Sequence, residues 1–219
     1  PMNAITRNLA VVLVFAALSL SLDTLADQSG DIRHLQSRWA EVNYQLAGKA
    51  QKTAFEQLIE TAEQTTTRHP ESPEAWIWSG IIKSSYAGVA GGLSALKYAK
   101  AAKSDLEAAM NIDDSALSGS AYTSLGTLYA QVPGWPLGFG NDKKAEKMLK
   151  KAVSLNPNGI DSNYFYGRFL ADEGRYQEAR TYLTRARQAP SRPDRPLADA
   201  GRHEEIDKAL AEVGAKLAK

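Results

Sequence analysis

The stretch over residues 161–190, DSNYFYGRFLADEGRYQEARTYLTRARQAP, constrains the fold more than any other part of the chain. Its apolar residues recur at helical spacing on both sides of Gly174, where glycine accepts the positive φ of a tight turn without steric cost. Pro190 ends the second of the two helical segments. The small residues Gly167 and Ala179 allow the two helix axes to approach closely. The stretch therefore predicts a helix–turn–helix hairpin whose apolar face needs neighbouring hairpins to cover it.

The spacing in this hairpin matches the tetratricopeptide repeat, a unit of about 34 residues with the pattern W-x2-L-G-x2-Y, then A-x3-F and a later proline. With Gly167 at the glycine of the pattern, Ala179 and Leu183 fall at the A-x3-F positions. Two earlier segments match as well, one with Gly80 and the other with Gly126 at the glycine position. The sequence therefore predicts an all-α, tetratricopeptide-like, right-handed α-solenoid of antiparallel helix pairs.

Both earlier repeats are longer than the pattern between their two helices, by about ten residues in one and by about seven in the other. The excess lies in residues 86–93, YAGVAGGL, and in residues 132–140, VPGWPLGFG. Because adjacent repeats stack in register, we expect both insertions to form loops that project from the same rim of the solenoid.

Four segments follow from these patterns. Residues 1–26 are predicted to be a signal peptide, and residues 27–72 an N-terminal helical pair. Residues 73–193 hold the tetratricopeptide-like repeats with their two inter-helix insertions, and residues 194–219 are predicted to form a C-terminal capping helix. A terminal helix with a polar outer face is what a stack of repeats needs at its end.

The N-terminal segment has the features of an export signal. Arg7 precedes an uncharged and mostly apolar run at residues 9–22, LAVVLVFAALSLSL, and Thr24 with Ala26 offers a small-residue cleavage site. The run has about 14 residues, fewer than the roughly 20 that a spanning helix needs. We therefore expect an exported, soluble protein of the periplasm, without stable membrane insertion after cleavage. The alternative is an uncleaved anchor.

Composition narrows the chemistry. The chain has no cysteine, which excludes disulfides, thiolate metal sites, cysteine nucleophiles and a lipid-modified cysteine. The formal net charge is +1 with acidic and basic residues interspersed, so nucleic acid is not an expected partner. The histidines His34, His69 and His203 are far apart and lack metal-ligand spacing, and no phosphate loop or nucleophile elbow is present. We expect no cofactor, no metal and no catalytic residue.

The insertion at residues 132–140 carries large apolar side chains on a loop fixed by proline and glycine. Trp135 and Phe139, together with Tyr86 from the other insertion, are predicted to frame a ligand or partner site as an aromatic lid. The alternative is that Trp135 and Phe139 fold back onto the core.

The first helices of the repeats are expected to line the concave face of the solenoid. Ile77 and Ile81 are predicted to be exposed there, and Tyr164 and Arg168 lie one helical turn apart. A guanidinium next to an aromatic face binds anionic groups, which makes this pair a candidate anion site. The alternative is a solvated arginine packed on Tyr164.

Three segments carry a resemblance to a known family: WIWSGIIKSSYAGVAGGLSAL, PGWPLGFGNDKKAEKMLKKAVSLNPNGIDSNYFYGRFL and APSRPDRPLADAGRHEEI. They resemble bacterial exported tetratricopeptide-repeat proteins grouped with the T component associated with TRAP-type transporters. The resemblance implies an all-α fold in the periplasm, a substrate-binding protein as partner, and a small apolar or organic-acid ligand. Lipoprotein members need a cysteine at the mature N-terminus, which this chain lacks.

These patterns lead to one functional hypothesis and one alternative. The hypothesis is a periplasmic protein–protein interaction or ligand-handling module without catalysis, working with the substrate-binding protein of a transporter. The alternative is a hydrolase or transferase whose site lies on the insertion loops. Acidic, histidine or serine groups converging near Trp135 would favour the enzyme.

Overall fold

The computed structural model describes residues 27–219, which are helical and contain no strand. The predicted signal peptide, residues 1–26, lies outside the described residues. A first helix covers residues 27–45. The helices that follow are α2 (Gly48–Arg68), α3 (Pro73–Ala90), α4 (Gly92–Ile112), α5 (Ala116–Gln131), α6 (Asp142–Leu155), α7 (Ile160–Asp172), α8 (Tyr176–Arg187) and α9 (Pro196–Leu217).

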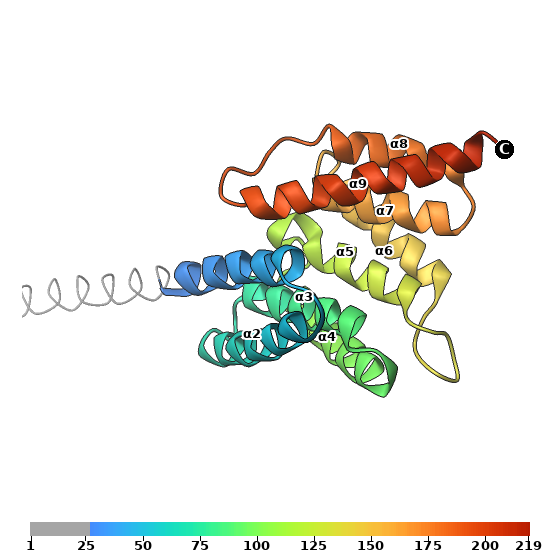
Figure 1. Cartoon of the computed structure of the whole chain (residues 1–219). Coiled ribbons are helices and arrows are strands. Elements are labelled where there is room, and N and C mark those ends of the chain that lie inside the picture. The colour runs from blue at the N-terminus through green and yellow to red at the C-terminus, as the bar shows by residue number, and fades with distance from the viewer. Residues whose placement is uncertain (1–26) are drawn as a thin grey trace, which may run out of the picture.

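The helices stack as antiparallel pairs, with α3 against α4, α5 against α6 and α7 against α8 (Figure 1). The helix at residues 27–45 and α2 precede the first pair, and α9 packs on α7 and α8 after the last. The predicted all-α, tetratricopeptide-like solenoid of helix pairs is therefore confirmed. None of the helices within residues 27–219 combines the length and the apolar composition needed to cross a membrane.

The same glycine-to-leucine contact holds each of the three pairs together. In each pair the first helix presents a glycine to a leucine of the second, so closely that a Cβ on the glycine would collide with the leucine side chain. The contacts, given as the distance from that Cβ to the leucine Cγ, are Gly80 to Leu106 at 2.6 Å, Gly126 to Leu149 at 2.6 Å and Gly167 to Leu183 at 2.8 Å. The repeat register assigned from the sequence is the register of the fold.

The prediction that residues 86–93 form an insertion loop is wrong. Residues 86–93 are largely helical, because α3 continues to Ala90 and α4 begins at Gly92. The chain turns at Gly91 and Gly92, with φ of 74° and 57°, a backbone region that glycine tolerates best. The extra residues therefore lengthen both helices of the pair. The second insertion does form a loop, between α5 and α6.

The predicted capping helix α9 also reaches the other end of the chain. At its N-terminal end, Gly201 lies against the ring of Tyr44 from the first helix, with no room for a side chain. Ala198 joins the apolar cluster built by the first helix, α2 and α3. The start of α9 and the first helix therefore meet, which brings the two ends of the described chain into contact.

Candidate functional site

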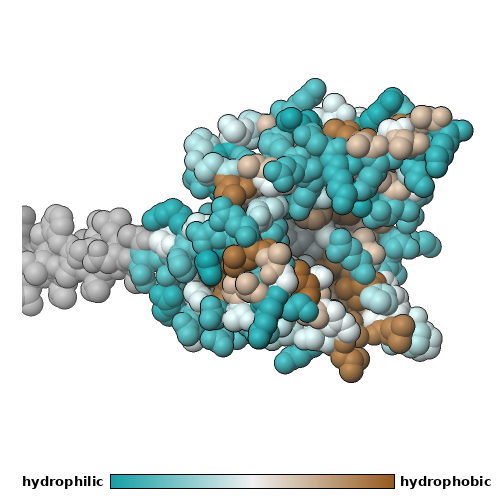
Figure 2. All heavy atoms as spheres, viewed as in Figure 1, coloured by the Kyte–Doolittle hydropathy of each residue, from teal (hydrophilic) through white to brown (hydrophobic). Residues whose placement is uncertain are grey.

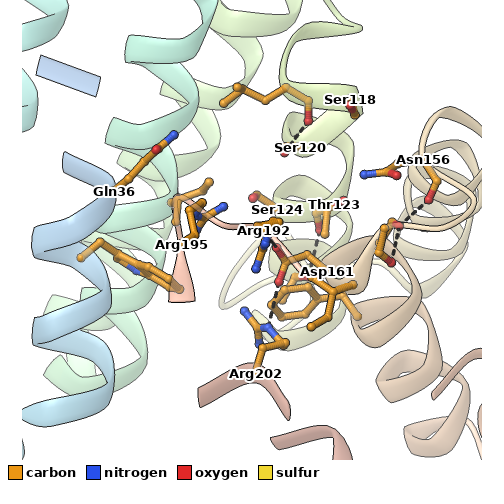
Figure 3. A pocket seen from close by; sticks show the side chains of 18 of the residues that line it. Gln36, Ser118, Ser120, Thr123, Ser124, Asn156, Asp161, Arg192, Arg195 and Arg202 are labelled. Atoms are coloured by element: carbon orange, nitrogen blue, oxygen red, sulfur yellow. Dashed lines mark hydrogen bonds and ion pairs between the residues drawn. The ribbon is translucent and has the colours of Figure 1, made fainter. Parts of the chain in front are cut away.

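The concave side of the solenoid contains a cavity of about 600 Å³. It lies between the first described helix, α3, α5, α7 and the segment that joins α8 to α9 (Figure 3). A volume of this size falls within the range of small-molecule sites, which is roughly 300–1,000 Å³. The hydroxyl side chains that α3 and α5 contribute to the lining are Ser84, Ser85, Ser118, Ser120, Thr123, Ser124 and Thr127.

Aromatic rings form the apolar part of the cavity. Trp39 and Trp78 meet edge to face, with ring centroids 5.8 Å apart, and Phe165 contributes from α7. The indole Nε1 of Trp39 donates a hydrogen bond to Ser85 Oγ at 2.9 Å. The indole Nε1 of Trp78 is buried and has no hydrogen-bond partner among the described residues. A buried donor without an acceptor is uncommon and costly.

Asp161 anchors the basic side of the cavity from the first turn of α7. Its carboxylate accepts from Arg192 Nη1 at 2.7 Å and from Arg202 Nε at 2.8 Å. Figure 3 shows Asp161 between the two guanidiniums. Asp199 accepts from Arg192 Nε at 2.6 Å, and Glu205 accepts from Arg202. Both arginines therefore have their charge neutralised within the protein.

The charge balance at Asp161 favours the carboxylate. Burial alone would raise its pKa, but Arg202 and Arg192 outweigh burial and lower the pKa from 3.8 to about 2. The carboxylate therefore stays ionised at any physiological pH. Its chemical role is to fix the two arginines, because an anion held between two cations is a poor general base.

Arg195 is the arginine that this network leaves without a partner. Its guanidinium carbon lies 5.0 Å from the ring centroid of Trp78, in a cation–π contact. The Nε atom is buried, and within residues 27–219 the side chain makes no hydrogen bond or ion pair. Burial, followed by repulsion from Arg192, lowers the pKa of Arg195, and the carboxylates of Asp161, Asp199 and Asp194 offset only part of this. An anion beside the guanidinium would stabilise its charged form further.

Tyr86 does not lie on a rim with Trp135, and that part of the predicted site is wrong. Only 6% of Tyr86 is exposed, and its ring packs on Tyr98 with centroids 4.6 Å apart. Its hydroxyl donates to Glu56 Oε1 at 2.6 Å. The reason is the helical continuation of α3, which turns residue 86 into the core of the N-terminal part.

The two isoleucines of α3 divide between core and cavity. The prediction that Ile77 is exposed on the concave face is wrong, because Ile77 is fully buried against α4 and α5. Ile81 is half-buried and lines the cavity. Ile77 faces the apolar cluster shared with α4 and α5, whereas Ile81, one helical turn later, reaches the cavity.

Tyr164 and Arg168 lie beside a second, smaller hollow of about 260 Å³. Arg168 is already paired, with its Nη1 2.6 Å from Glu212 Oε2. The guanidinium that faces Tyr164 is that of Arg202, 4.6 Å from the ring centroid. The predicted anion site at Tyr164 and Arg168 is therefore occupied by internal partners from α9.

The loop between α5 and α6 separates the two aromatic residues that the lid hypothesis groups together. Phe139 is half-buried and packs against the core, with its ring centroid 5.6 Å from that of Tyr129. Trp135 is 90% exposed, so it has not folded back. Trp135 is not among the residues that line the cavity, and it does not act as a lid over it.

Arg195 and Trp78 are site residues that the sequence patterns do not single out. Arg195 lies in a proline-rich connection, SRPDRP, which is typical of a linker, and Trp78 has the spacing of a core residue. Three arginines within eleven positions, at 192, 195 and 202, are the available signal. Their meeting with Trp78 depends on the closure of α9 onto the first helix.

One histidine has a carboxylate partner that its sequence spacing does not suggest. His69 Nε2 lies 2.9 Å from Asp31 Oδ2, and Asp27 is close by. Arg68 Nη1 also contacts Asp31 Oδ2, at 2.8 Å. A cation already holds this carboxylate, so the cluster is an ion-pair network between the first helix and the end of α2.

Comparisons with known proteins agree on the fold and add no activity. Among solved structures, this chain is similar to a thermophilic TPR protein of Thermus thermophilus, where TPR denotes the tetratricopeptide repeat. The TM-score is 0.55 at 16% sequence identity, and the match covers 84% of this chain and 99% of that one. No protein-family model and no curated protein matches the chain. The likeness shows a TPR-like fold.

Proposed function

We propose that this protein is a ligand-handling module that holds an organic acid in its concave cavity. TPR-like stacks expose extended concave surfaces that serve for binding, and here the closure by α9 converts that surface into a cavity of small-molecule size. The ligand combines an anionic group with an apolar body, because the walls offer both a cation and aromatic rings.

The observation that carries the proposal is the unsatisfied pair formed by Arg195 and Trp78. Both side chains line the cavity, and no ion pair of Arg195 is found within the described residues. Arg195 Nε and Trp78 Nε1 are closed off from solvent, so the terminal guanidinium nitrogens of Arg195 are the donors that a ligand in the cavity would meet. A carboxylate provides acceptor oxygens and a negative charge, so it suits the guanidinium best. The hydroxyl groups on α5 are placed to hydrogen-bond the remaining polar atoms of such a ligand.

The lining does not favour the enzyme alternative. The serines of the cavity have no histidine among the lining residues, and Asp161 is held by two arginines. The described contacts of the loop that carries Trp135 are with apolar and aromatic side chains and with Lys103. The hydrolase or transferase site on the loops stays an untested prediction.

The proposal also covers the cellular location of the protein and its protein partner. The apolar run before residue 27 supports export to the periplasm. The resemblance to the TRAP-associated T component supports transfer of the acid to or from a transporter's substrate-binding protein. In this scheme the module protects or relays the ligand, and the transporter moves it.

Affinity capture from periplasmic extract, followed by mass spectrometry of bound small molecules and proteins, tests this function. Three baits are compared: the native protein, Arg195→Gln, and the matched control Arg180→Gln at an exposed arginine outside the cavity. We expect an organic acid to be retained by the native protein and by Arg180→Gln, and to be lost with Arg195→Gln.

Two other outcomes have distinct meanings. Retention of a peptide through its C-terminal carboxylate, lost in Arg195→Gln, would keep the anion site but change the ligand from a metabolite to a protein segment. Equal retention by all three baits would contradict the cavity as the binding site.

A further inference from the structure

Three large apolar side chains project into solvent from one end of the solenoid. Leu93 in the first turn of α4 is 90% exposed, as is Trp135 in the loop between α5 and α6, and Leu137 in the same loop is 71% exposed. Figure 2 shows hydrophobic residues gathered at the lower right of the molecule, where Figure 1 places the start of α4 and this loop. We call Leu93, Trp135 and Leu137 the apolar edge.

Contacts between the loop and α4 make these side chains parts of one surface. A Cβ on Gly138 would lie 3.4 Å from Leu96 Cδ1, so the loop touches α4 one turn from Leu93. Further along, the ammonium of Lys103 lies 6.0 Å from the ring centroid of Phe139. The loop therefore runs beside the N-terminal half of α4.

The loop is held in shape by its own backbone. Gly140 N donates to Pro133 O at 3.0 Å, Leu137 N donates to Gly134 O at 3.1 Å, and Asn141 N donates to Tyr129 O at 2.8 Å. Phe139 anchors the loop in the core. Trp135 and Leu137 are therefore presented outward by a fixed turn, and exposed apolar groups gathered in one place commonly mark a binding surface.

Unpaired lysines flank the apolar edge on both sides. The α6 sequence DKKAEKMLKKAVSL carries five lysines against two acidic residues. In contrast, Lys103 and Lys150 are paired with Glu107 and Glu146. The flanking lysines that are exposed and form no ion pair in the described residues are Lys97 and Lys100 on α4 and Lys143, Lys144 and Lys147 on α6.

We propose that the apolar edge binds the surface of a bilayer that contains anionic phospholipid. Tryptophan is enriched where apolar chains meet headgroups, because its ring is apolar and its N–H is polar. Leucine side chains beside it add apolar area, and lysines at headgroup depth are attracted by the negative surface. The apolar edge and its flanking residues combine the tryptophan, the leucines and the lysines at one end of the molecule.

The charges argue against a second copy of the chain as the occupant. A two-fold contact would place the edge against itself and bring two sets of unpaired lysines together. Like charges facing each other across an interface disfavour association. A negatively charged lipid surface is the complementary partner, and it needs no matching shape.

The binding test is sedimentation with vesicles of phosphatidylcholine alone and of phosphatidylcholine mixed with phosphatidylglycerol. The protein tested begins at residue 27, the predicted processing site, because the run at residues 9–22 would bind lipid by itself. Residues 27–219 build the apolar clusters that the structure describes. We expect binding to the mixed vesicles, weakened by salt, and little binding to phosphatidylcholine.

Two pairs of variants separate the apolar and the charged contributions. Trp135→Ser with Leu137→Ser should lower binding by about tenfold or more, and Lys143→Gln with Lys147→Gln by several-fold. The control for the apolar change is Leu217→Ser, an exposed leucine in the last turn of α9. The control for the charge change is Lys208→Gln with Lys216→Gln, and neither control should alter binding.

Every site changed is exposed, so circular dichroism and the melting temperature should be unchanged and a loss of binding is not a loss of fold. Absence of binding to the mixed vesicles would overturn the proposal, as would equal binding by the Trp135 and Leu137 variant. A native dimer that becomes monomeric in that variant would show that the edge is a self-interface instead. None of these outcomes depends on Arg195, so the cavity proposal stands or falls separately.

Discussion

The concave cavity and the apolar edge show opposite relations between burial and polarity. The cavity is recessed yet lined by hydroxyl groups and arginines, whereas the edge is highly solvent-exposed yet carries large apolar side chains. Folding stability alone favours apolar side chains in a recess and polar side chains at an exposed edge. Burying polar groups and exposing apolar groups both cost free energy. These two departures, at separate places, are the basis of the two binding sites that we propose.

Two tryptophans make this comparison measurable, and truncating the cavity tryptophan should have the largest effect on stability. Trp78 is 2% exposed and packs on Trp39 and in the N-terminal core. Trp78→Ala should lower the free energy of unfolding by about 3–5 kcal/mol, since it leaves a cavity that the surrounding helices cannot fill. Urea unfolding followed by circular dichroism measures the change. A loss as small as that at an exposed site would show that Trp78 is not part of the core.

Overpacking a helix contact should come next. Gly167→Leu places a side chain against Leu183 and should destabilise the protein by about 1–3 kcal/mol or more, and Ala179→Leu should act similarly. The control is Gly214→Leu on α9, where nothing lies within 4 Å of the added Cβ. Unchanged melting temperatures for both core variants would mean that the repeat register is wrong.

Acid should weaken the ion pairs of Asp161 beside the cavity and should not change the contacts at the apolar edge. The folded-state pKa of Asp161 is about 2, against 3.8 for the free side chain, so its contribution is complete above pH 3.8 and is lost as the pH falls towards 2. Asp161→Asn should therefore be about 2 kcal/mol less stable than the native protein near neutral pH. The difference should fall to a small part of that value at about pH 2, where half of the native carboxyl is protonated, and should disappear below that pH. Urea midpoints at both pH values provide the measurement, and a difference that persists in acid would contradict the ion-pair account.

Truncating the edge tryptophan should have the smallest effect on stability. Trp135→Ala removes a side chain that is 90% exposed, so the free energy of unfolding should change by no more than about 0.5 kcal/mol. The same variant should lose most of its affinity for anionic vesicles. If Trp135→Ala is unfolded under conditions where the native protein is folded, Trp135 is a core residue and its exposed placement is contradicted.

Local patterns in the sequence are sufficient for the repeats. Glycines at 80, 126 and 167 predict the close contacts between paired helices, because a missing Cβ has a local geometric consequence. Periodicity cannot show that α3 continues through residues 86–90, since YAGVA suits either a loop or a helix that buries Tyr86. Comparison with a consensus length shows that residues are added, but not whether they extend a helix or form a loop.

The site is not predictable in the same way. Its cation, Arg195, and its aromatic partner, Trp78, are separated by more than a hundred residues and meet because Gly201 on α9 fits against Tyr44. This closure depends on how far the whole stack curves, which is the sum of small rotations between pairs. The sequence alone does not decide whether Trp135 is a lid residue or a core residue. The backbone hydrogen bonds of its loop hold the side chain in solvent.

Binding of an anionic aromatic probe, anilinonaphthalene sulfonate, tests the cavity most directly. Its sulfonate suits Arg195, its rings suit the aromatic wall, and energy transfer from tryptophan reports on the distance. We predict that Arg195→Gln weakens binding by about tenfold to a hundredfold, as expected for a hydrogen bond to a charged group. Arg180→Gln and the double variant Trp135→Ser with Leu137→Ser should bind as the native protein does. Unchanged affinity in Arg195→Gln, or loss of binding in the double variant, would contradict the cavity as the ligand site.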